Sequence, residues 1–281
     1  MIMIYEIYNE AVNIGKDFNI PSSDIRVLLS HIEGFKEPID VLYYRDNEVQ
    51  YPDEFWYKFE DLKKGKPVEY VINEAQFFDK MLYVDERVLI PRRETSELVA
   101  LISQKISSYF DPRNYLVVAD IGTGSGAIAL ALKSLFHNWL ITASDISKEA
   151  LEIAKMNFDK YSARINVLEG DSLKPYIDAN MALDIIVSTP PYILNKGDVQ
   201  PSVMDFEPHE ALFLDKNDSV YEKIFKDVYK VKKGSLLMCF EIGYDLQKYL
   251  EDLMKKYLHD FEYEFMNDLD DRLRFLFIYL R

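Results

Sequence analysis

Apolar side chains recur at the three- and four-residue spacing of α-helices from the start of the chain to about residue 65. Pro21-Ser22-Ser23-Asp24 and Pro52-Asp53 are signals that start helices, and Gly34 and Gly65 stand where helices would end. The pattern predicts a small helical bundle over residues 1–66. It contains no cluster of side chains suited to catalysis, which favours a role in recognising a substrate protein.

The pattern changes between residues 67 and 90, where short β-prone runs replace the helical spacing. The runs are Val68–Ile72, Gln76–Phe78 and Met81–Val84, with Asp79-Lys80 as a candidate hairpin turn. We therefore expect a β-hairpin connector at 67–90. It joins the bundle to a larger domain at 91–281.

Apolar runs of strand length alternate with amphipathic helical stretches through this larger domain, as in sheets with helices on their faces. The expected strands are Tyr115–Asp120, Trp139–Ser144, Ile165–Leu168, Ile185–Val187, Ser235–Ile242, Phe261–Met266 and Phe275–Leu280. A short acidic turn separates the last two, so they are expected to pair antiparallel at the sheet edge. The fold class is therefore α/β: a Rossmann-like, seven-stranded sheet with an antiparallel last strand, preceded by the helical bundle.

The stretch Ile90–Thr95 leads into the first helix of the larger domain, and Thr95 is a candidate N-cap. The pair Arg92-Arg93 could bind a carboxylate or an acidic loop of a partner. Equally, it could form solvent-exposed salt bridges with Glu94 or Glu97.

Composition narrows the class of protein. Lys and Arg total 33 against 48 for Asp and Glu, and the net charge of −15 argues against broad binding to a nucleic-acid backbone. The single cysteine, Cys239, lies in an apolar run, which predicts a buried thiol and a reducing compartment. No apolar run is long enough to cross a membrane and no signal peptide is recognisable, so we expect a cytoplasmic protein. We also expect it to be a monomer. The four histidines are scattered, and no metal site is expected.

A glycine-rich loop, Ile121–Ala127, follows the first strand of the larger domain and precedes a helix. Glycines allow close approach of a ligand, and a helix N-terminus offers unpaired N–H groups. Asp145 follows the next strand, where a carboxylate can accept both ribose hydroxyls of an adenosine. These features fit either a dinucleotide or another adenosine cofactor.

Two further carboxylates separate these alternatives. Asp120 stands two residues before the first glycine and is expected to face the ligand, where it would repel a pyrophosphate but suit a sulfonium or an ammonium. Asp171 and Ser172 follow the third strand and provide a polar end suited to an adenine edge. Adenosine and a cation without a diphosphate indicate S-adenosylmethionine.

The stretch Asp184–Tyr192 runs from an apolar strand into two prolines and a tyrosine. Each proline fixes φ and removes an N–H donor, so the turn at Pro190-Pro191 presents carbonyl acceptors. Acceptors beside an aromatic ring suit a planar group that carries NH2, such as a base amine or a side-chain amide. A rigid turn that merely ends a strand is the simpler interpretation of the same residues.

Several stretches make the chain similar to the protein-(glutamine-N5) methyltransferases that modify peptide chain release factors. The stretches are Gly65–Ile72, Leu89–Thr95, Asp120–Ala127, Phe206–Phe213 and Glu241–Gly243. The resemblance implies that the substrate is the glutamine of the Gly-Gly-Gln loop in a class 1 release factor. It implies that the N-terminal bundle helps to bind that protein.

The resemblance also assigns the site residues. The cofactor would contact the loop residues Gly122, Thr123, Gly124, Ser125 and Gly126, with Asp145 at the ribose and Asp171 or Ser172 near the adenine. Thr189, Pro190, Pro191 and Tyr192 would hold the glutamine, with Arg92 as a further substrate contact. Tyr192 would stack on the amide plane, and the Pro190 carbonyl would accept one of its N–H groups.

Thr189 departs from the family, which has asparagine at this position. An asparagine oxygen and the Pro190 carbonyl would orient the amide so that its nitrogen faces the methyl group. A threonine hydroxyl can accept a hydrogen bond but is shorter and can rotate. The departure leaves two alternatives open: an exocyclic-amine methyltransferase that acts on adenine or cytosine in nucleic acid, and a non-catalytic relative that binds S-adenosylmethionine.

Overall fold

The computed structural model describes residues 2–111 and 113–281 and divides into two units. The first comprises the N-terminal residues up to Glu74 together with Val199–Glu207. The second comprises Ala75–Asp198 and Pro208–Arg281. Met1, which belongs to the predicted bundle, lies outside the described residues.

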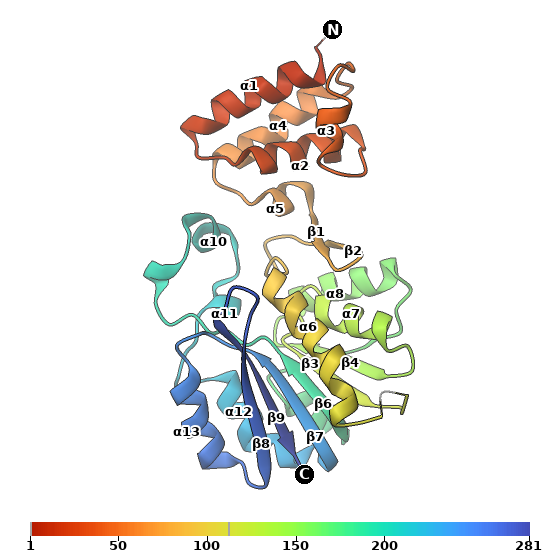
Figure 1. Cartoon of the computed structure of the whole chain (residues 1–281), viewed down its shortest axis with the longest axis vertical. Coiled ribbons are helices and arrows are strands. Elements are labelled where there is room, and N and C mark those ends of the chain that lie inside the picture. The colour runs from red at the N-terminus through yellow and green to blue at the C-terminus, as the bar shows by residue number, and fades with distance from the viewer. Residues whose placement is uncertain (1, 112) are drawn as a thin grey trace. The chain divides into compact units, whose positions relative to one another are not determined.

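The first unit is helical (Figure 1). Its helices are α1 (Ile4–Asp17), α2 (Ser22–Glu33), α3 (Asp40–Tyr43), α4 (Pro52–Lys63), α5 (Val68–Ile72) and α10 (Pro201–Phe206). Pro52 occupies the first turn of α4, where its missing N–H costs nothing. Gly34 ends α2 at a φ of 70°, a left-handed conformation that glycine adopts without strain. The apolar faces predicted for the first helices meet in one core, which includes Ile7, Leu28 and Phe55.

The expectation of a β-run at Val68–Ile72 is wrong, because these residues form helix α5. Pro67 precedes the helix with extended backbone, and Asn73 ends it at a φ of 57°. The apolar residues of α5 are buried in the core of the first unit, together with residues of α2 and α4. This tertiary burial outweighs the β-propensity of the run. The first unit therefore extends to Glu74, past the predicted end of the bundle at residue 66.

The hairpin itself is formed by β1 (Glu74–Phe77) and β2 (Lys80–Tyr83). Its turn contains Phe78 at a φ of 53° and Asp79, one residue earlier than predicted. The shift keeps Phe77 and Leu82 buried in the core of the second unit.

A seven-stranded sheet forms the centre of the second unit, with the order β5-β4-β3-β6-β7-β9-β8. Its strands are β3 (Val117–Ile121), β4 (Leu140–Asp145), β5 (Asn166–Glu169), β6 (Leu183–Ser188), β7 (Lys232–Glu241), β8 (Phe261–Asn267) and β9 (Leu273–Leu280). The pairs from β5 to β7 are parallel, and β9 pairs antiparallel with both β7 and β8. The predicted α/β sheet with its antiparallel last strand is confirmed.

Helices cover both faces of this sheet (Figure 1). They are α6 (Arg93–Lys105), α7 (Ala127–Leu135), α8 (Lys148–Lys160), α9 (Lys174–Asp178), α11 (His209–Leu212), α12 (Val220–Asp227) and α13 (Gln247–Tyr257), with short 3₁₀ turns at Ile106–Ser108, Lys196–Asp198 and Val228–Lys230. Residues of α6, α7 and α8 share one core with Val118, Ile185 and Cys239, whereas those of α12 and α13 share another with Ala119 and Ile186. The alternation of neighbouring strand residues between the two cores follows from the two-residue period of a strand.

Cys239 is fully buried, as its apolar surroundings in the sequence predict, and burial raises the pKa of its thiol. Within the described residues, no helix combines the length and the apolar character that a membrane span requires.

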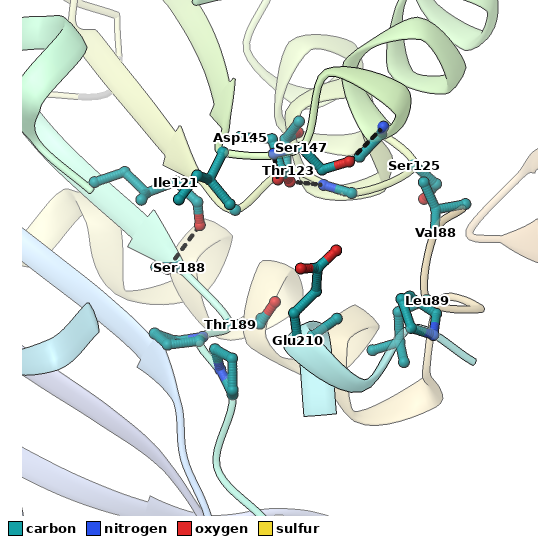
Figure 2. A pocket seen from close by; sticks show the side chains of 18 of the residues that line it. Val88, Leu89, Ile121, Thr123, Ser125, Asp145, Ser147, Ser188, Thr189 and Glu210 are labelled. Carbon is teal, nitrogen blue, oxygen red and sulfur yellow. Dashed lines mark hydrogen bonds between the residues drawn. The ribbon is translucent and has the colours of Figure 1, made fainter. Parts of the chain in front are cut away.

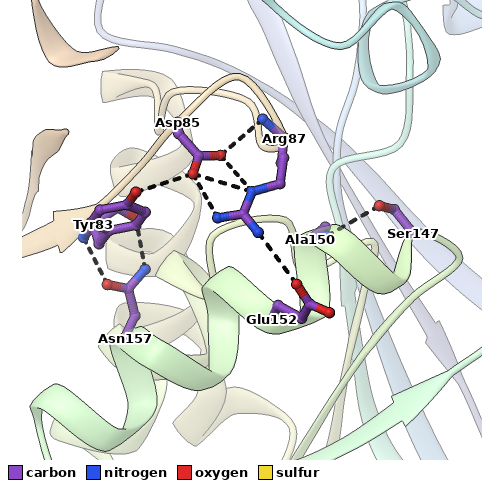
Figure 3. A network of polar contacts seen from close by, with 7 residues as sticks. All are labelled: Tyr83, Asp85, Arg87, Ser147, Ala150, Glu152 and Asn157. Atoms are coloured by element: carbon purple, nitrogen blue, oxygen red, sulfur yellow. Dashed lines mark hydrogen bonds and ion pairs between the residues drawn. The ribbon is translucent and has the colours of Figure 1, made fainter. Parts of the chain in front are cut away.

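Asn157 on α8 connects the hairpin to the glycine-rich loop and is fully buried. Its side-chain oxygen accepts the Tyr83 N–H at 2.7 Å, and its amide nitrogen donates to the carbonyls of Tyr83 at 3.0 Å and Ser125 at 2.9 Å. Figure 3 shows the two contacts with Tyr83. It also shows two ion pairs of Arg87, one with Asp85 and one with Glu152 of α8. One amide thus satisfies backbone groups of two segments that are distant in sequence.

Replacement of Asn157 by leucine is expected to destabilise the protein by roughly 2–4 kcal/mol, because buried backbone groups of Tyr83 and Ser125 lose their partners. Chemical denaturation followed by circular dichroism measures the loss. Asn166→Leu, at an exposed position on β5, is the matched control and should change stability by less than about 0.5 kcal/mol. Equal effects of the two substitutions would contradict the role assigned to Asn157.

Candidate active site

A pocket of the second unit lies where the parallel strands end (Figure 2). Its lining includes residues of the segments Arg87–Arg92, Ile121–Ser125, Asp145–Ser147, Gly170–Ser172, Ser188–Pro191 and Pro208–Ala211. The carboxyl ends of β3, β4 and β6 are adjacent because these strands pair in parallel, so residues distant in sequence meet here. Among the predicted site residues, Asp120, Gly126 and Tyr192 do not line this pocket, whereas the others do.

The glycine-rich loop has left-handed backbone at three positions, with φ of 72° at Gly122, 53° at Gly124 and 84° at Gly126. A Cβ on Gly126 would lie 2.5 Å from Cε1 of Phe158, so this glycine is required where the loop packs against α8. A Cβ on Gly122 or Gly124 would meet no atom within 4 Å. These two glycines therefore border open space, on the side where a ligand would approach.

Asp120 is predicted to face the ligand, but it lies beneath this loop. It is fully buried, and its Oδ2 accepts the Thr123 hydroxyl at 2.6 Å and the Ala129 N–H at 3.1 Å. Within the described residues its Oδ1 has no hydrogen-bond partner. Burial raises the pKa of Asp120 to about 7, against the opposing effect of these hydrogen bonds. Its contribution to the site is to hold the loop.

Asp145 borders the pocket, and its role at a ribose stays a prediction. Its Oδ2 accepts the Gly124 N–H and its Oδ1 accepts the Ser147 N–H, both at 2.9 Å. Burial is the main reason why the pKa of Asp145 is raised, and these N–H donors oppose it. Ser147 caps α8 by accepting the Ala150 N–H at 3.1 Å.

Asp171 and Ser172 lie together in the lining after β5. Lys223 of α12 forms an ion pair with Asp171 at 2.7 Å and a second one with Asp218 at 2.8 Å. Ser172 is buried at a φ of 52°, and within the described residues its hydroxyl has no hydrogen-bond partner. An unsatisfied hydroxyl beside a carboxylate is suited to bind the edge of a polar ring.

These features fit S-adenosylmethionine. The two glycines border open space, Asp145 offers a carboxylate to hydroxyl groups, and the unpaired Ser172 hydroxyl lies in the same lining. Among the residues that the structure describes, no group of three His, Cys, Asp or Glu side chains is arranged to hold a metal ion.

The Pro-Pro turn contributes Thr189, Pro190 and Pro191 to the lining, whereas the Tyr192 side chain is directed elsewhere. The hydroxyl of Tyr192 hydrogen-bonds to the Glu241 carboxylate, and Arg274 lies 5.7 Å from the centre of its ring. Burial raises the pKa of Tyr192 above its ordinary range. The tyrosine thus connects the turn to the end of β7.

The prediction that Thr95 is the N-cap of the first helix of this domain is wrong. Helix α6 begins at Arg93, so Thr95 lies within it and does not act as its N-cap. Its hydroxyl instead donates to Oε2 of Glu241 at 2.7 Å. Glu241 is buried, which raises its pKa, while Thr95, Arg274 and Tyr192 oppose the rise. This carboxylate therefore joins α6, β9 and the Pro-Pro turn.

The two arginines at the start of α6 have different positions. Arg93 forms ion pairs with Asp270 and, within the helix, with Glu97. Arg92 lies in the pocket lining.

The comparison with known proteins agrees with this geometry. The family model of the methyltransferase small domain matches residues 102–216. The release factor glutamine methyltransferase of Bacillus subtilis is 38% identical over 75% of this chain and 75% of its own length. That of Streptococcus pneumoniae is 40% identical over 71% of this chain and 70% of its own. The chain belongs to the release factor glutamine methyltransferase family.

Solved structures of other methyltransferases share the fold of this family member. The human METTL16 catalytic domain in complex with an RNA hairpin has a TM-score of 0.55 at 14% identity, covering 83% of this chain and 84% of that one. A methyltransferase from Pyrococcus furiosus has a TM-score of 0.50 at 15% identity, covering 81% and 95%. At these identities the likeness shows the fold alone.

The structure adds residues of this family member that the sequence analysis did not identify as part of the site. They are Asn157, Glu210, Lys223, Glu241 and Arg274. Each is a polar side chain within a helix or a strand, where it is indistinguishable in sequence from solvent-exposed charge. Only Glu241, the last residue of the apolar strand β7, had a signal comparable to that of Asp145, which ends β4.

The buried Asp120 makes stability depend on pH. Its folded-state pKa of about 7 lies above the ordinary value of 3.8. The protonated carboxyl therefore stabilises the folded protein fully at low pH, and this stabilisation is lost as the pH rises towards 7. Asp120→Asn keeps an acceptor for Thr123 and does not titrate. The free energy of unfolding of the native protein, relative to that of the variant, should therefore fall by roughly 2 kcal/mol between about pH 5 and pH 7.5. Urea titrations at both pH values measure this change. The same difference in the free energy of unfolding between the native protein and the variant at both pH values would contradict it.

Proposed function

We propose that this protein transfers the methyl group of S-adenosylmethionine to the side-chain nitrogen of the glutamine in the Gly-Gly-Gln loop of a class 1 release factor. The observation that carries the proposal is the pocket in which the glycine loop, Asp145, Asp171 and the turn at Thr189-Pro190 come together. The relatives in the same family are named release factor glutamine methyltransferases, which supports the proposal.

On the cofactor side, Gly122 to Ser125 would contact the amino-acid part, Asp145 the ribose hydroxyls, and Asp171 with Ser172 the adenine. S-adenosylmethionine supplies an activated methyl group on a sulfonium. Thr123 and Asp120 hold the loop through a buried hydrogen bond, and Lys223 holds Asp171. The pocket residues thus bind and orient, and transfer needs proximity and alignment more than acid–base catalysis.

On the substrate side, Thr189 and the Pro190 carbonyl would accept the two amide N–H groups of the glutamine. An amide nitrogen is a weak nucleophile because its lone pair is delocalised into the carbonyl. Two acceptors orient it and stabilise the positive charge that develops on it. Tyr192 would act at this turn, whose position its hydrogen bond to Glu241 helps to define. Arg92, in the same lining, is a candidate contact for the release factor.

The helical unit would take part in recognising the release factor. It carries exposed aromatic side chains, among them Tyr43, Tyr51 and Tyr57. Large exposed aromatic residues are frequent at sites of protein recognition.

The proposal is tested by supplying labelled S-adenosylmethionine together with a class 1 release factor. We expect label on the native release factor and none on a variant whose loop glutamine is replaced by alanine. DNA and RNA serve as competing substrates in parallel reactions. Label on nucleic acid would instead support an amine methyltransferase, and cofactor binding without any transfer would support a non-catalytic protein.

A second test asks whether the Thr189 hydroxyl accepts a hydrogen bond from the glutamine amide. Thr189→Asn should raise the turnover rate by about tenfold or more, because an amide oxygen reaches further than a hydroxyl and cannot rotate to donate. Thr189→Val has nearly the same shape without an acceptor and should lower the rate by a similar factor. Initial rates with saturating release factor measure both, with the cofactor dissociation constant as the control. An unchanged rate in Thr189→Val would exclude an acceptor role for this hydroxyl.

A further inference from the structure

Glu210 extends from the short helix α11 into the cofactor pocket. Figure 2 shows its carboxylate in the space between Thr189, the segment at Leu89 and the loop that carries Asp145. The side chain is exposed, and no hydrogen bond or ion pair holds it within the described part of the chain. Its charge acts on Asp145, since Glu210 is one of the groups that raise the pKa of that carboxyl.

The other charged groups of the lining have different surroundings. Arg87 is bound to Asp85 and Glu152, Asp171 is bound to Lys223, and Asp145 accepts backbone N–H groups. Arg92 is close enough to Tyr192 to lower the pKa of its hydroxyl, so this cation lies towards the Pro-Pro turn. The carboxylate of Glu210 therefore presents an uncompensated negative charge to whatever occupies the pocket.

The two forms of the cofactor differ in the charge that this carboxylate would meet. S-adenosylmethionine carries a sulfonium, whereas S-adenosylhomocysteine, which remains after transfer, has a neutral thioether. Adenosine, ribose and the amino-acid group are the same in both. A carboxylate near the sulfur attracts the first form and has no comparable attraction for the second.

We propose that Glu210 is a specificity-determining residue that makes the pocket prefer S-adenosylmethionine over S-adenosylhomocysteine. Loss of the sulfonium charge removes the attraction at the moment when the product must leave. Glu210 thereby reduces inhibition by the product without taking part in the transfer. This inference rests on the proposed use of S-adenosylmethionine but not on the identity of the methyl acceptor.

The experiment measures dissociation constants of both compounds by isothermal titration calorimetry, without any release factor. The quantity compared is the ratio of the S-adenosylhomocysteine constant to the S-adenosylmethionine constant. Glu210→Gln should lower this ratio by about fivefold and Glu210→Lys by more, as one charge is removed and then reversed. High salt should diminish the difference between the native protein and these variants.

Asp159→Asn is the matched control, because it removes one negative charge at an exposed position of α8 outside the pocket lining. Its ratio should equal that of the native protein. A common shift of both constants in Glu210→Gln, leaving the ratio unchanged, would overturn the inference. Failure of the native protein to bind either compound would instead contradict the proposed cofactor. Thermal denaturation of each variant verifies that it is folded.

Discussion

The parallel pairing of β3 with β4 and β6 is the constraint on which the site depends. Its register places Ile121 beside both Ser144 and Ser188, so three strand ends finish at one level. The Ser188 hydroxyl reinforces this by donating to the Ile121 carbonyl at 2.7 Å. The glycine loop, Asp145 and the Pro-Pro turn each begin one or two residues later, and they consequently surround a single pocket. A shift of one residue in the pairing of β3 with β4 would displace the loop from Asp145, and a shift in its pairing with β6 would displace it from the turn.

Buried polar side chains then determine the shapes of the loops around this pocket. Asp120 holds the glycine loop from below, Asn157 joins that loop to the hairpin, and Glu241 connects the Pro-Pro turn to α6. Each satisfies donors or acceptors from different elements. A buried group that lost one of these partners would bear the full cost of desolvation. The loops are therefore rigid through their polar anchors as well as through apolar packing.

The charge distribution of the lining connects this architecture with the reaction. Two of its ionised groups form ion pairs: Arg87 with Asp85, and Asp171 with Lys223. Such pairs fix positions and add little net field. Glu210 is different, because its carboxylate faces the pocket without such a partner in the described chain. Binding and release of a cofactor that changes its charge would therefore depend more on Glu210 than on the ion-paired side chains of Arg87 and Asp171.

The sequence by itself determined the sheet, because strands and helices have different periods, and also the segments that border the pocket, because glycines, prolines and acidic residues directly follow apolar strands. It could not determine that Val68–Ile72 is helical, since burial against α2 and α4 outweighs a local β-propensity. It also could not show that Asp120 lies under the loop or that Thr95 binds Glu241, because which atom a polar side chain meets depends on neighbours distant in sequence. Local propensity thus decided the elements apart from α5, and tertiary packing decided α5 and the partners of the polar groups.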